Sequence, residues 1–364
     1  PAPVAEPGRR PAPPAVVAVV VTRNPGPWFE DALAALADQD YPNLAVLVID
    51  AASDQDPTPR VAGALPDAYV RRIDDNPGFG AAANHVREVV DGAAFYCFLH
   101  DDAAPAPDAM SVLVGEALRS NAGVVGPKLV DFSDERRLLQ VGESVDKTGE
   151  RTSLVEPGEL DQEQHDAIRD VFVVPGACTL VRADLFEHID GFDPGIDALN
   201  DDLNLCWRAH VAGARVIVAP DAVVRHLESL GDKVPVEDRR ERLMRHRIRT
   251  MLSCYSRWHL VRVVPQAVLV SLLEVVYSVV VGRGRQARDV VDAWRWNLAR
   301  RDEISAWRRK VEGFRTVPDA EIRRFQLRGS ARVARYLRGQ TGRGGTRGDQ
   351  AQAAFRRLYE GLRT

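Results

Sequence analysis

The chain has 364 residues, of which 45% are hydrophobic and 27% are charged, a composition typical of a folded protein long enough for two domains. Its net charge of −4 hides an asymmetry, because residues 1–230 carry 18 basic and 38 acidic side chains (net −20), whereas residues 231–364 carry 30 and 14 (net +16). The acidic first segment argues against a nucleic-acid binder, since it would repel a polyanion. Four cysteines without a C-x-x-C pair argue against a disulfide framework or a zinc site and fit a reducing compartment.

The beginning of the chain is rich in proline. Residues 1–14 contain six prolines and no apolar run, so we expect a disordered leader and no signal peptide. The first residue is Pro1 instead of Met, which favours a piece of a longer protein. The sequence leaves open whether that protein has membrane spans elsewhere.

A strand–helix–strand unit follows this leader. The β-branched apolar run 15–21 predicts a buried strand that ends at a loop rich in Pro and Gly. Residues 28–38 repeat apolar side chains at helical spacing, and residues 44–49 predict a second buried strand. A unit of this length is typical of a parallel sheet, and we therefore predict an α/β fold.

The same alternation continues to residue 230, so we predict one domain over residues 15–230. The further strands are expected at 70–73, 94–99, 171–181 and 215–219, and the further helices at 81–90 and 108–119. Pro175 and Gly176 interrupt the stretch 171–181, which predicts a pair of strands there. The polar segment 132–168 is weakly periodic. We expect it to form a β-excursion, that is, short strands that leave the main sheet and lie over the site.

Polar residues gather where these predicted strands end. The clusters are Thr22–Asn24, Asp50, Asn76–Gly80 and His100–Asp102. In open α/β sheets, ligands bind beyond the carboxyl ends of the strands, so we expect the four clusters to form one site. A lone Asp after a strand is usually a turn or cap residue, but four such clusters in one domain favour a shared function.

Three groups of titratable side chains could carry chemistry at this site. Asp101 and Asp102 follow a strand and suit a divalent cation, Mg²⁺ or Mn²⁺, that also holds a diphosphate, although such a pair alone is more often a solvated turn. Asp201 and Asp202 precede a helix, where one of them could cap the helix or act as general base toward an acceptor hydroxyl. His226 follows the last strand and could close the metal shell from the opposite side, although a single His is usually structural.

The order of these motifs over residues 16–230 resembles that of glycosyltransferase family 2, the GT-A-type nucleotide-sugar transferases. The matching stretches are Thr22-Arg23-Asn24, Val48 to Asp54, Asn76 to Asn84, His100-Asp101-Asp102, Gly176-Ala177-Cys178 with Gly191-Phe192-Asp193, Asp201 to Arg208, and Val224-Arg225-His226. No single stretch is decisive, but their common order makes the resemblance strong.

The resemblance also implies a role for each matching residue. The nucleotide would be bound by Thr22, Arg23, Asn24, Asp50, Asn76, Gly80, Asn84, His100 and Asp101. Asp102 and His226 would hold the metal, either Mn²⁺ or Mg²⁺, and Asp202 would be the general base beside Asp201. The acceptor side would include Gly176, Trp207 and Arg208.

The resemblance implies an inverting reaction by a single displacement. The donor would be a UDP- or dTDP-sugar, and the acceptor a glycan or a polyprenyl-diphosphate-linked glycan. Within the family, the Arg-rich helical tail resembles that of the rhamnosyl- and galactofuranosyl-type transferases of bacterial cell envelopes, whose acceptors are often polyprenyl-diphosphate glycans. We therefore expect a role in cell-envelope polysaccharide synthesis.

Three positions depart from the family's pattern. His100 stands where the family has the first carboxylate of its metal motif, Asp201 replaces a Glu, and Asn204 replaces an Asp in the helix motif. His100 is the change that most threatens metal affinity, although imidazole can bind Mn²⁺. These changes keep open an alternative, a catalytically degenerate domain that binds nucleotide sugar and serves as a scaffold.

The character of the sequence changes after residue 230. Residues 239–256 predict a basic helix, and residues 263–281 are apolar for nearly the length of a membrane span. A narrow small-or-polar stripe, made of Ala267, Ser271, Glu274 and Ser278, runs along this apolar helix. Because Glu274 would be costly inside a bilayer, we favour an amphipathic helix, lying in the interface or packed in a helical domain, over a span.

For the rest of the chain we predict Arg- and Trp-rich helices over 286–336, a flexible break at 339–348 and a short helix at 349–362. We therefore divide the C-terminal part into a basic amphipathic helical domain (231–338) and a tail (339–364). The positive segment 235–340 fits an anionic membrane surface, which predicts the cytoplasmic face of the plasma membrane, peripherally or as part of a longer membrane protein. Arg-rich helices that merely pack against the acidic domain are the alternative.

Overall fold

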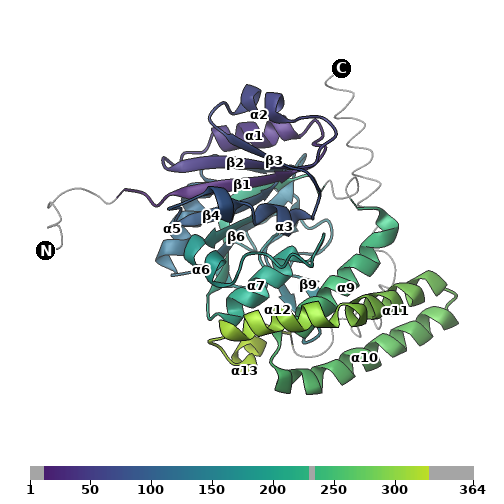
Figure 1. Cartoon of the computed structure of the whole chain (residues 1–364). Helices are drawn as coiled ribbons and strands as arrows, with labels where there is room; N and C mark the ends of the chain where they lie inside the picture. The colour runs from purple at the N-terminus through teal and green to yellow at the C-terminus, as the bar shows by residue number, and fades with distance from the viewer. Residues whose placement is uncertain (1–11, 229–233, 328–364) are drawn as a thin grey trace, which may run out of the picture.

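The computed structural model describes residues 12–228 and 234–327 of the chain, and Figure 1 shows their arrangement. The predicted leader falls mostly outside these residues, and the predicted tail at 339–364 falls wholly outside them. Within them, an α/β sheet with flanking helices is followed by a helical region, as the sequence predicts.

The first half of the fold alternates strands and helices. It consists of β1 (Val16–Thr22), α1 (Phe29–Ala37), β2 (Leu44–Ala51), α2 (Thr58–Ala64), β3 (Tyr69–Ile73), α3 (Phe79–Ala83), α4 (Val86–Val89), β4 (Phe95–His100), β5 (Ala103–Pro105), α5 (Ala109–Arg119) and β6 (Val124–Asp131). The predicted helix at 81–90 is divided into α3 and α4, and Asn84 lies between them with its amide bonded to the backbone of Phe192.

The second half adds short strands and then helices only. It consists of β7 (Leu138–Gln140), β8 (Glu143–Val145), β9 (Arg151–Ser153), β10 (Arg169–Asp170), β11 (Cys178–Arg182), α6 (Ala183–His188), α7 (Asp201–Val211), β12 (Val216–His226), α9 (Val236–Cys254), α10 (Arg257–Val280), α11 (Gly284–Ala299), α12 (Arg301–Gly313), α13 (Asp319–Ile322) and the 3₁₀ turn η1 (Arg323–Phe325). The expected β-excursion is present as β7, β8 and β9.

Several elements differ from the prediction, since the strands β5, β6 and β10 and the helices α2 and α6 were not predicted. The sequence reading missed β6, a buried strand that contains Gly126, Pro127 and the charged Lys128, which obscure its apolar pattern. Lys128 is accommodated because its ammonium group lies 2.7 Å from both Asp161 and Asp166. The predicted strand pair at 171–181 is only partly right, since β11 alone forms there and residues 171–174 continue as a buried extended segment.

The strands form a mixed sheet in the order β10-β12-β6-β11-β4-β1-β2-β3, with β5 paired to β12 and β7 to β6. The pairs β1–β2, β1–β4, β2–β3 and β6–β12 are parallel, whereas β11 runs antiparallel between β4 and β6. This arrangement confirms the predicted Rossmann-like, mostly parallel core.

Alternate residues of the central strands enter different cores on the two faces of the sheet. Val16, Ala18 and Val20 of β1 pack with α1, α2 and α5 on one face. Val17, Val19 and Val21 belong to the other core, to which α3, α6 and α7 contribute. Both faces are therefore buried, as a parallel sheet requires.

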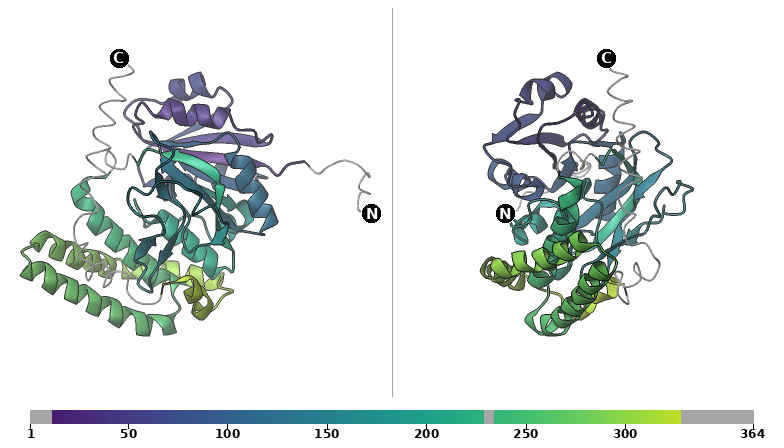
Figure 2. Two further views of the ribbon diagram at one scale, coloured as in Figure 1. Left: turned by 180° about the vertical axis from the view of Figure 1, so that it is seen from behind. Right: turned by 90° about the vertical axis from the view of Figure 1, so that its right-hand side faces the viewer.

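The second of these cores extends into the helical region. It includes Met251 of α9, Leu260 of α10 and Trp307 of α12 together with residues of the sheet. Figure 1 shows α11 and α12 following one another end to end below the sheet, with α10 alongside α11, and Figure 2 shows the same helices from two further sides. The expected domain boundary at residue 230 therefore cuts through a shared core.

Candidate functional site

The register of the parallel strands aligns three of the predicted polar clusters. Thr22 at the end of β1 lies opposite Asp50 on β2, and Asp50 in turn lies opposite Arg72 on β3. On the other side of β1, Val21 is paired with His100 of β4. The carboxyl ends of these strands thus form one edge, where an open α/β sheet places its ligand.

Three side chains from distant parts of the chain meet at this edge. The ligand atoms of His100, Asp102 and His226 all lie within 4.8 Å of one another. His226 Nε2 is 3.2 Å and His100 Nδ1 is 3.9 Å from Asp102 Oδ1. His226 reaches this place because β12 pairs with β5, which puts it opposite Ala103, the residue directly after Asp102.

This cluster has the donor set of a divalent-cation site. One carboxylate oxygen and two imidazole nitrogens converge from the ends of two strands and the turn between β4 and β5, and both Asp102 and His226 are buried. Asp102 and His226 were expected as metal ligands, whereas His100 was expected at the nucleotide. The geometry brings His100 to the same point as the two expected ligands, with the edge of the Phe79 ring against it at 4.8 Å between centroids.

Asp101 has different surroundings from its neighbour. Its Oδ2 accepts a hydrogen bond of 2.7 Å from Thr22 Oγ1, and both residues are buried. This bond joins the end of β1 to the turn that carries Asp102. Two residues expected at the nucleotide therefore also fix the position of the cation cluster.

The next part of the site is a hydrogen-bonded cluster around Asp50. The buried Asp50 carboxylate accepts hydrogen bonds from Arg72 Nε at 2.8 Å and from Ser53 N at 3.2 Å. Ser53 Oγ accepts another bond, 2.7 Å long, from the backbone N–H of Asn24. Arg72 was missed in the sequence, where the only signal was a basic residue in the strand following Asp50. Arg23 and Asn76 are exposed near the same strand ends.

The glycine-containing stretch 76–80 lies directly on the loop before α7. Gly78 has a φ of +97°, and a Cβ there would lie 2.0 Å from the carbonyl oxygen of Asp197. A Cβ at Gly80 would lie 2.7 Å from Asp201 Oδ1. Side chains at these two positions would push the stretch 76–80 away from the residues around Asp201. This close approach explains why both positions are glycine.

Asn84 is bonded through its side chain to the loop before α7. Its side-chain carbonyl accepts a bond from Phe192 N at 2.7 Å, and its amide donates to Phe192 O at 3.0 Å. The amide thus holds the loop before α7, and its expected contact with the nucleotide stays a prediction.

The candidate base, Asp202, is held by an arginine that the sequence analysis did not single out. Arg151 of β9 donates to both carboxylate oxygens of Asp202, at 2.8 and 2.7 Å. Arg151 also pairs with Glu143 of β8. Burial lowers the pKa of this guanidinium, but the charges of Asp202 and Glu143 raise it further, so Arg151 stays protonated. Gly176 lies against Asp202, since a Cβ there would come 3.1 Å from Asp202 Oδ2.

Asp201 differs sharply from Asp202. Burial, and then the charge of Asp202, raise the pKa of Asp201 to about 8. Asp201 is therefore largely protonated at neutral pH, while Asp202 carries the bidentate ion pair. Two adjacent carboxyl groups with such different surroundings are suited to different roles.

Trp207 and Arg208 belong to the core and not to an acceptor site. Trp207 is fully buried between Phe172 and Tyr255. Arg208 is also fully buried, and it donates to Asn204 Oδ1 at 2.8 Å and to Ile189 O at 2.7 Å. Their expected contact with the acceptor is wrong, because the face of α7 that carries them packs against the helical region.

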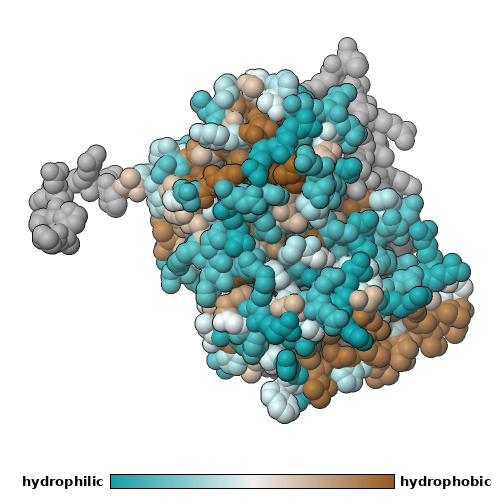
Figure 3. Space-filling model, viewed as in Figure 1, coloured by the Kyte–Doolittle hydropathy of each residue, from teal (hydrophilic) through white to brown (hydrophobic). Residues whose placement is uncertain are grey.

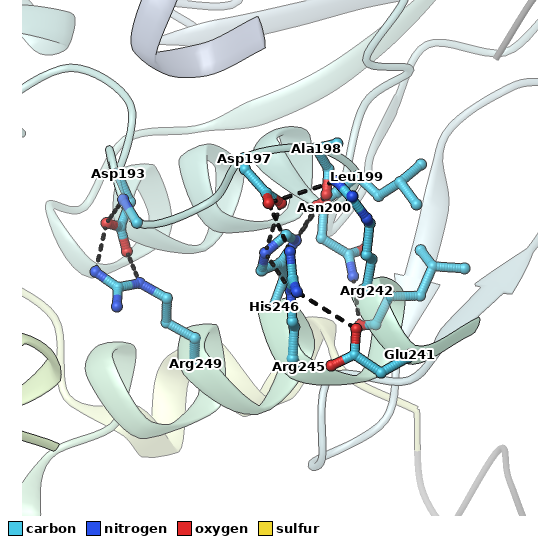
Figure 4. Close-up of polar contacts among 12 residues, drawn as sticks. Asp193, Asp197, Ala198, Leu199, Asn200, Glu241, Arg242, Arg245, His246 and Arg249 are labelled. Carbon is cyan, nitrogen blue, oxygen red and sulfur yellow. Dashed lines mark hydrogen bonds and ion pairs between the residues drawn. The ribbon is translucent and has the colours of Figure 1, made fainter. Parts of the chain in front are cut away.

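The loop before α7 is fixed by charged residues of α9, as Figure 4 shows. Arg249 makes two hydrogen bonds of 2.8 Å to Asp193, and both side chains are buried. Arg245 Nη2 lies 2.6 Å and His246 Nε2 lies 3.1 Å from the Asp197 carboxylate. The helical region therefore holds the loop that leads to Asp201 and Asp202.

Comparisons with known proteins agree with this geometry. The family described as "Glycosyltransferase like family 2" matches residues 13–250. The chain is 26% identical over 149 residues to a "Pre-mycofactocin glycosyltransferase" of Mycobacterium tuberculosis, covering 40% of this chain and 29% of that protein. It is 26% identical over 213 residues to the "O-antigen biosynthesis protein RfbC" of Myxococcus xanthus, covering 56% of this chain and 16% of that protein. The chain thus spans less than a third of the length of either relative.

A solved structure supports the fold. The crystal structure of GalNAc-T7 with UDP, GalNAc and Mn²⁺ matches with a TM-score of 0.50 and 13% sequence identity, covering 58% of this chain and 43% of that one. At this identity the likeness concerns the fold alone.

Proposed function

Because the chain belongs to glycosyltransferase family 2, we propose that it is an inverting enzyme that transfers a sugar from UDP or dTDP to a glycan or lipid-linked acceptor. The observation that carries this proposal is the arrangement of its polar groups at one sheet edge. The candidate cation cluster at the ends of β4 and β12 and the Asp202 carboxylate at the start of α7 are joined by the turn that carries Gly176, since His100 N donates to Ala177 O at 3.0 Å and Gly176 lies against Asp202. Such a pair of groups suits the leaving diphosphate and the incoming hydroxyl respectively.

The donor would occupy the edge from Asp50 to His100. Arg72 and Asp50 offer a charged donor and a charged acceptor for the base and ribose. The hydrogen bond from Thr22 to Asp101 holds the end of β1 against the turn that carries Asp102. His100, Asp102 and His226 would hold a divalent cation, which when bound would offset the negative charge on the diphosphate. Two imidazoles beside one carboxylate favour Mn²⁺ over Mg²⁺, and the GalNAc-T7 structure contains Mn²⁺.

Asp202 would act as the general base. Its two oxygens have about four lone-pair positions, of which Arg151 uses two and the backbone N–H of Leu203 uses a third, so the carboxylate can still accept one hydrogen bond from an acceptor hydroxyl. The proton moves to Asp202 while the hydroxyl oxygen bonds to the anomeric carbon and the bond from that carbon to the diphosphate oxygen breaks. Nucleoside diphosphate leaves from the opposite face, so one displacement inverts the configuration.

The acceptor is proposed to be a glycan of the bacterial cell envelope, free or carried on a polyprenyl diphosphate. The support is the name of one relative, an O-antigen biosynthesis protein, together with the basic helical region beside Asp202. A catalytically degenerate nucleotide-sugar scaffold remains the second candidate, because His100 replaces a carboxylate of the family's metal motif. Retention of Asp202, Asp102 and His226 favours the enzyme.

Titration calorimetry of UDP and dTDP, with and without Mn²⁺, tests the proposed donor site. We expect one nucleotide to bind about tenfold or more tightly with Mn²⁺ than without it, and the variant Asp102→Asn to lose that difference. Asp221→Asn, which removes an exposed carboxylate from the same strand as His226, is the control and should behave as wild type. If neither nucleotide binds under any condition, the transferase proposal fails. Metal-dependent binding without turnover of any sugar donor would favour the scaffold.

A further inference from the structure

Helix α10 presents its polar stripe to the protein and its apolar face to the outside. The predicted stripe of Ala267, Ser271, Glu274 and Ser278 is buried. Ser271 Oγ accepts a bond of 3.0 Å from Trp294 of α11, and Glu274 pairs with Arg240 of α9 at 2.5 Å. The sequence predicts an amphipathic helix, and the structure adds that its orientation is the reverse of that in a soluble protein.

The outward face of α10 is a continuous apolar surface, which we call the α10 face. Its exposed side chains include Trp258, Val261, Leu269, Leu273, Val276 and Val280, with exposed fractions from 57% to 87%. They follow one another at helical spacing along 24 residues, or roughly 36 Å. Figure 3 shows this surface as a brown band along the lower right of the molecule. Single exposed apolar residues are common in soluble proteins, but a continuous row of this length marks an interaction surface.

The charges around the α10 face are positive and stand at its two ends. Arg257 and Arg262 are exposed at the beginning of the helix, and Arg283 and Arg285 follow its end. Between Arg262 and Arg283 the sole charged residue is Glu274, which lies on the buried side. An apolar band between two groups of arginines matches a bilayer surface, where hydrocarbon meets anionic head groups.

We propose that the α10 face is a membrane-docking surface, which lies in the plane of an anionic bilayer such as the cytoplasmic leaflet of the plasma membrane. By length and composition, α10 is the helix of the described residues that could cross a membrane, but only 28% of its most apolar stretch is buried in the protein. A span would remove Glu274 from Arg240 and Ser271 from Trp294 and place both polar groups in hydrocarbon. Lying flat keeps these contacts and buries only the apolar side.

Docking in this way would also place the active site near the bilayer, a consequence that rests on the proposed function. Lys147, in the turn between β8 and β9, bonds to Gln266 of α10. The same hairpin carries Arg151, which holds Asp202. The side of the molecule that carries the candidate base is thus joined directly to the membrane-facing helix, as a lipid-linked acceptor requires.

Vesicle flotation of the whole chain tests this docking without donor or acceptor. The probes are vesicles of phosphatidylcholine alone and of phosphatidylcholine with about 30% phosphatidylglycerol. We expect the wild type to float with the anionic vesicles and to bind the neutral ones more weakly, and the double variant Leu273→Glu/Val276→Glu to bind the anionic vesicles about tenfold or more weakly. The matched control is Leu118→Glu on α5, because Leu118 and Leu273 are both 59% exposed.

The control and the calorimetric titration separate docking from folding and from donor binding. Leu118→Glu should float as the wild type does, and all variants should keep the wild-type melting temperature and nucleotide affinity. A wild type that floats with neither kind of vesicle overturns the proposal. A wild type that does not float but forms a dimer, which Leu273→Glu/Val276→Glu converts to a monomer, assigns the face to a second copy of the chain and also overturns it.

Discussion

At the level of single residues, the adjacent carboxyl groups of Asp201 and Asp202 are given different tasks by their surroundings. Asp202 is fixed by the Arg151 guanidinium, which donates to both of its oxygens. Asp201 lies instead against Gly80, where a Cβ would come 2.7 Å from its Oδ1. The two carboxyl groups therefore have different surroundings, and each can be tested by substitution.

Arg151 is a positioning residue, and its removal should affect turnover more than donor binding. We expect Arg151→Ala to lower kcat by about tenfold or more, because the base loses the partner that orients it, and to leave the KM for the donor nearly unchanged. Arg151→Lys should recover part of kcat, since it keeps the charge but not the fork. Arg136→Ala, at an exposed position of the same excursion, is the control in steady-state assays. An equal loss of kcat in Arg136→Ala would show that any change in the segment 132–168 has this effect, and not the loss of Arg151 in particular.

The protonation of Asp201 should make stability depend on pH. The pKa of its carboxyl is about 8 in the folded chain, against an ordinary value of 3.8. Between these values the folded chain holds a proton that the unfolded chain has released, so stability falls as pH rises, and the contribution is lost as pH passes the folded pKa.

Asp201→Asn mimics the protonated form and removes this dependence. The stability of the variant relative to the wild type should therefore increase by about 1 kcal/mol or more between about pH 5 and about pH 8.5. Scanning calorimetry at both pH values measures the difference. Parallel changes of melting temperature in the two proteins would contradict the assignment.

At the level of elements, the loop 193–200 depends on α9 for its conformation. Leu199 and Asn200 are consecutive non-glycine residues with φ values of 65° and 68°, a region that side chains rarely occupy. The amide of Asn200 donates to Leu243 O at 2.9 Å, and Asp193 is held by the buried Arg249. Contacts with α9 thus stabilise a strained backbone directly before the carboxylate pair.

Breaking the buried Asp193–Arg249 pair should lower the free energy of unfolding and should also disturb the loop before the carboxylate pair. Arg249→Met leaves the Asp193 carboxylate buried without its partner, so we expect a loss of about 3 kcal/mol in the free energy of unfolding. The double variant Asp193→Asn/Arg249→Met should recover part of this loss. Arg295→Met, at an exposed position on α11, should change stability by about 0.5 kcal/mol or less. Urea unfolding measures the stability of all three variants. Equal losses of stability in Arg249→Met and Arg295→Met would contradict the role of the Asp193–Arg249 pair in holding the loop.

At the level of the whole molecule, the sheet and the helical region share one core. Trp207 of α7 packs on Tyr255, and Arg208 lies over the Trp307 ring with its guanidinium carbon 5.4 Å from the ring centre. We therefore expect residues 12–327 to unfold in a single transition, although the net charges of the segments before and after residue 230 have opposite signs.

Two tryptophans of the helical region provide a matched test of this shared core. Trp307 is buried between α12 and α7, whereas Trp258 is 87% exposed on α10. Trp307→Ala should lower stability by about 3 to 5 kcal/mol and shift the unfolding of the sheet with it. Trp258→Ala should leave stability within about 0.5 kcal/mol. Two separate transitions in Trp307→Ala, with the sheet unchanged, would show that the parts fold independently.

The local pattern of the sequence was sufficient for most of the fold. Short continuous apolar runs located β1, β2 and β4, whose two faces are both buried, and the 3.6-residue period located α1, α5 and the helices after residue 235, whose burial repeats along one face. The order of polar clusters at strand ends identified the family and the candidate residues Asp102, His226 and Asp202. The stripe of α10 was also visible, since it is a property of one helix.

Only the tertiary structure decided which distant side chains meet. Arg151 and Asp202 are 51 residues apart, and Arg72 faces Asp50 because of the register between β2 and β3. The same reason explains the errors at Trp207 and Arg208, whose partners lie on other elements. Periodicity encodes whether a position is buried, but the partner of a buried polar group depends on how separate elements cross, and that is set by the packing of the whole chain.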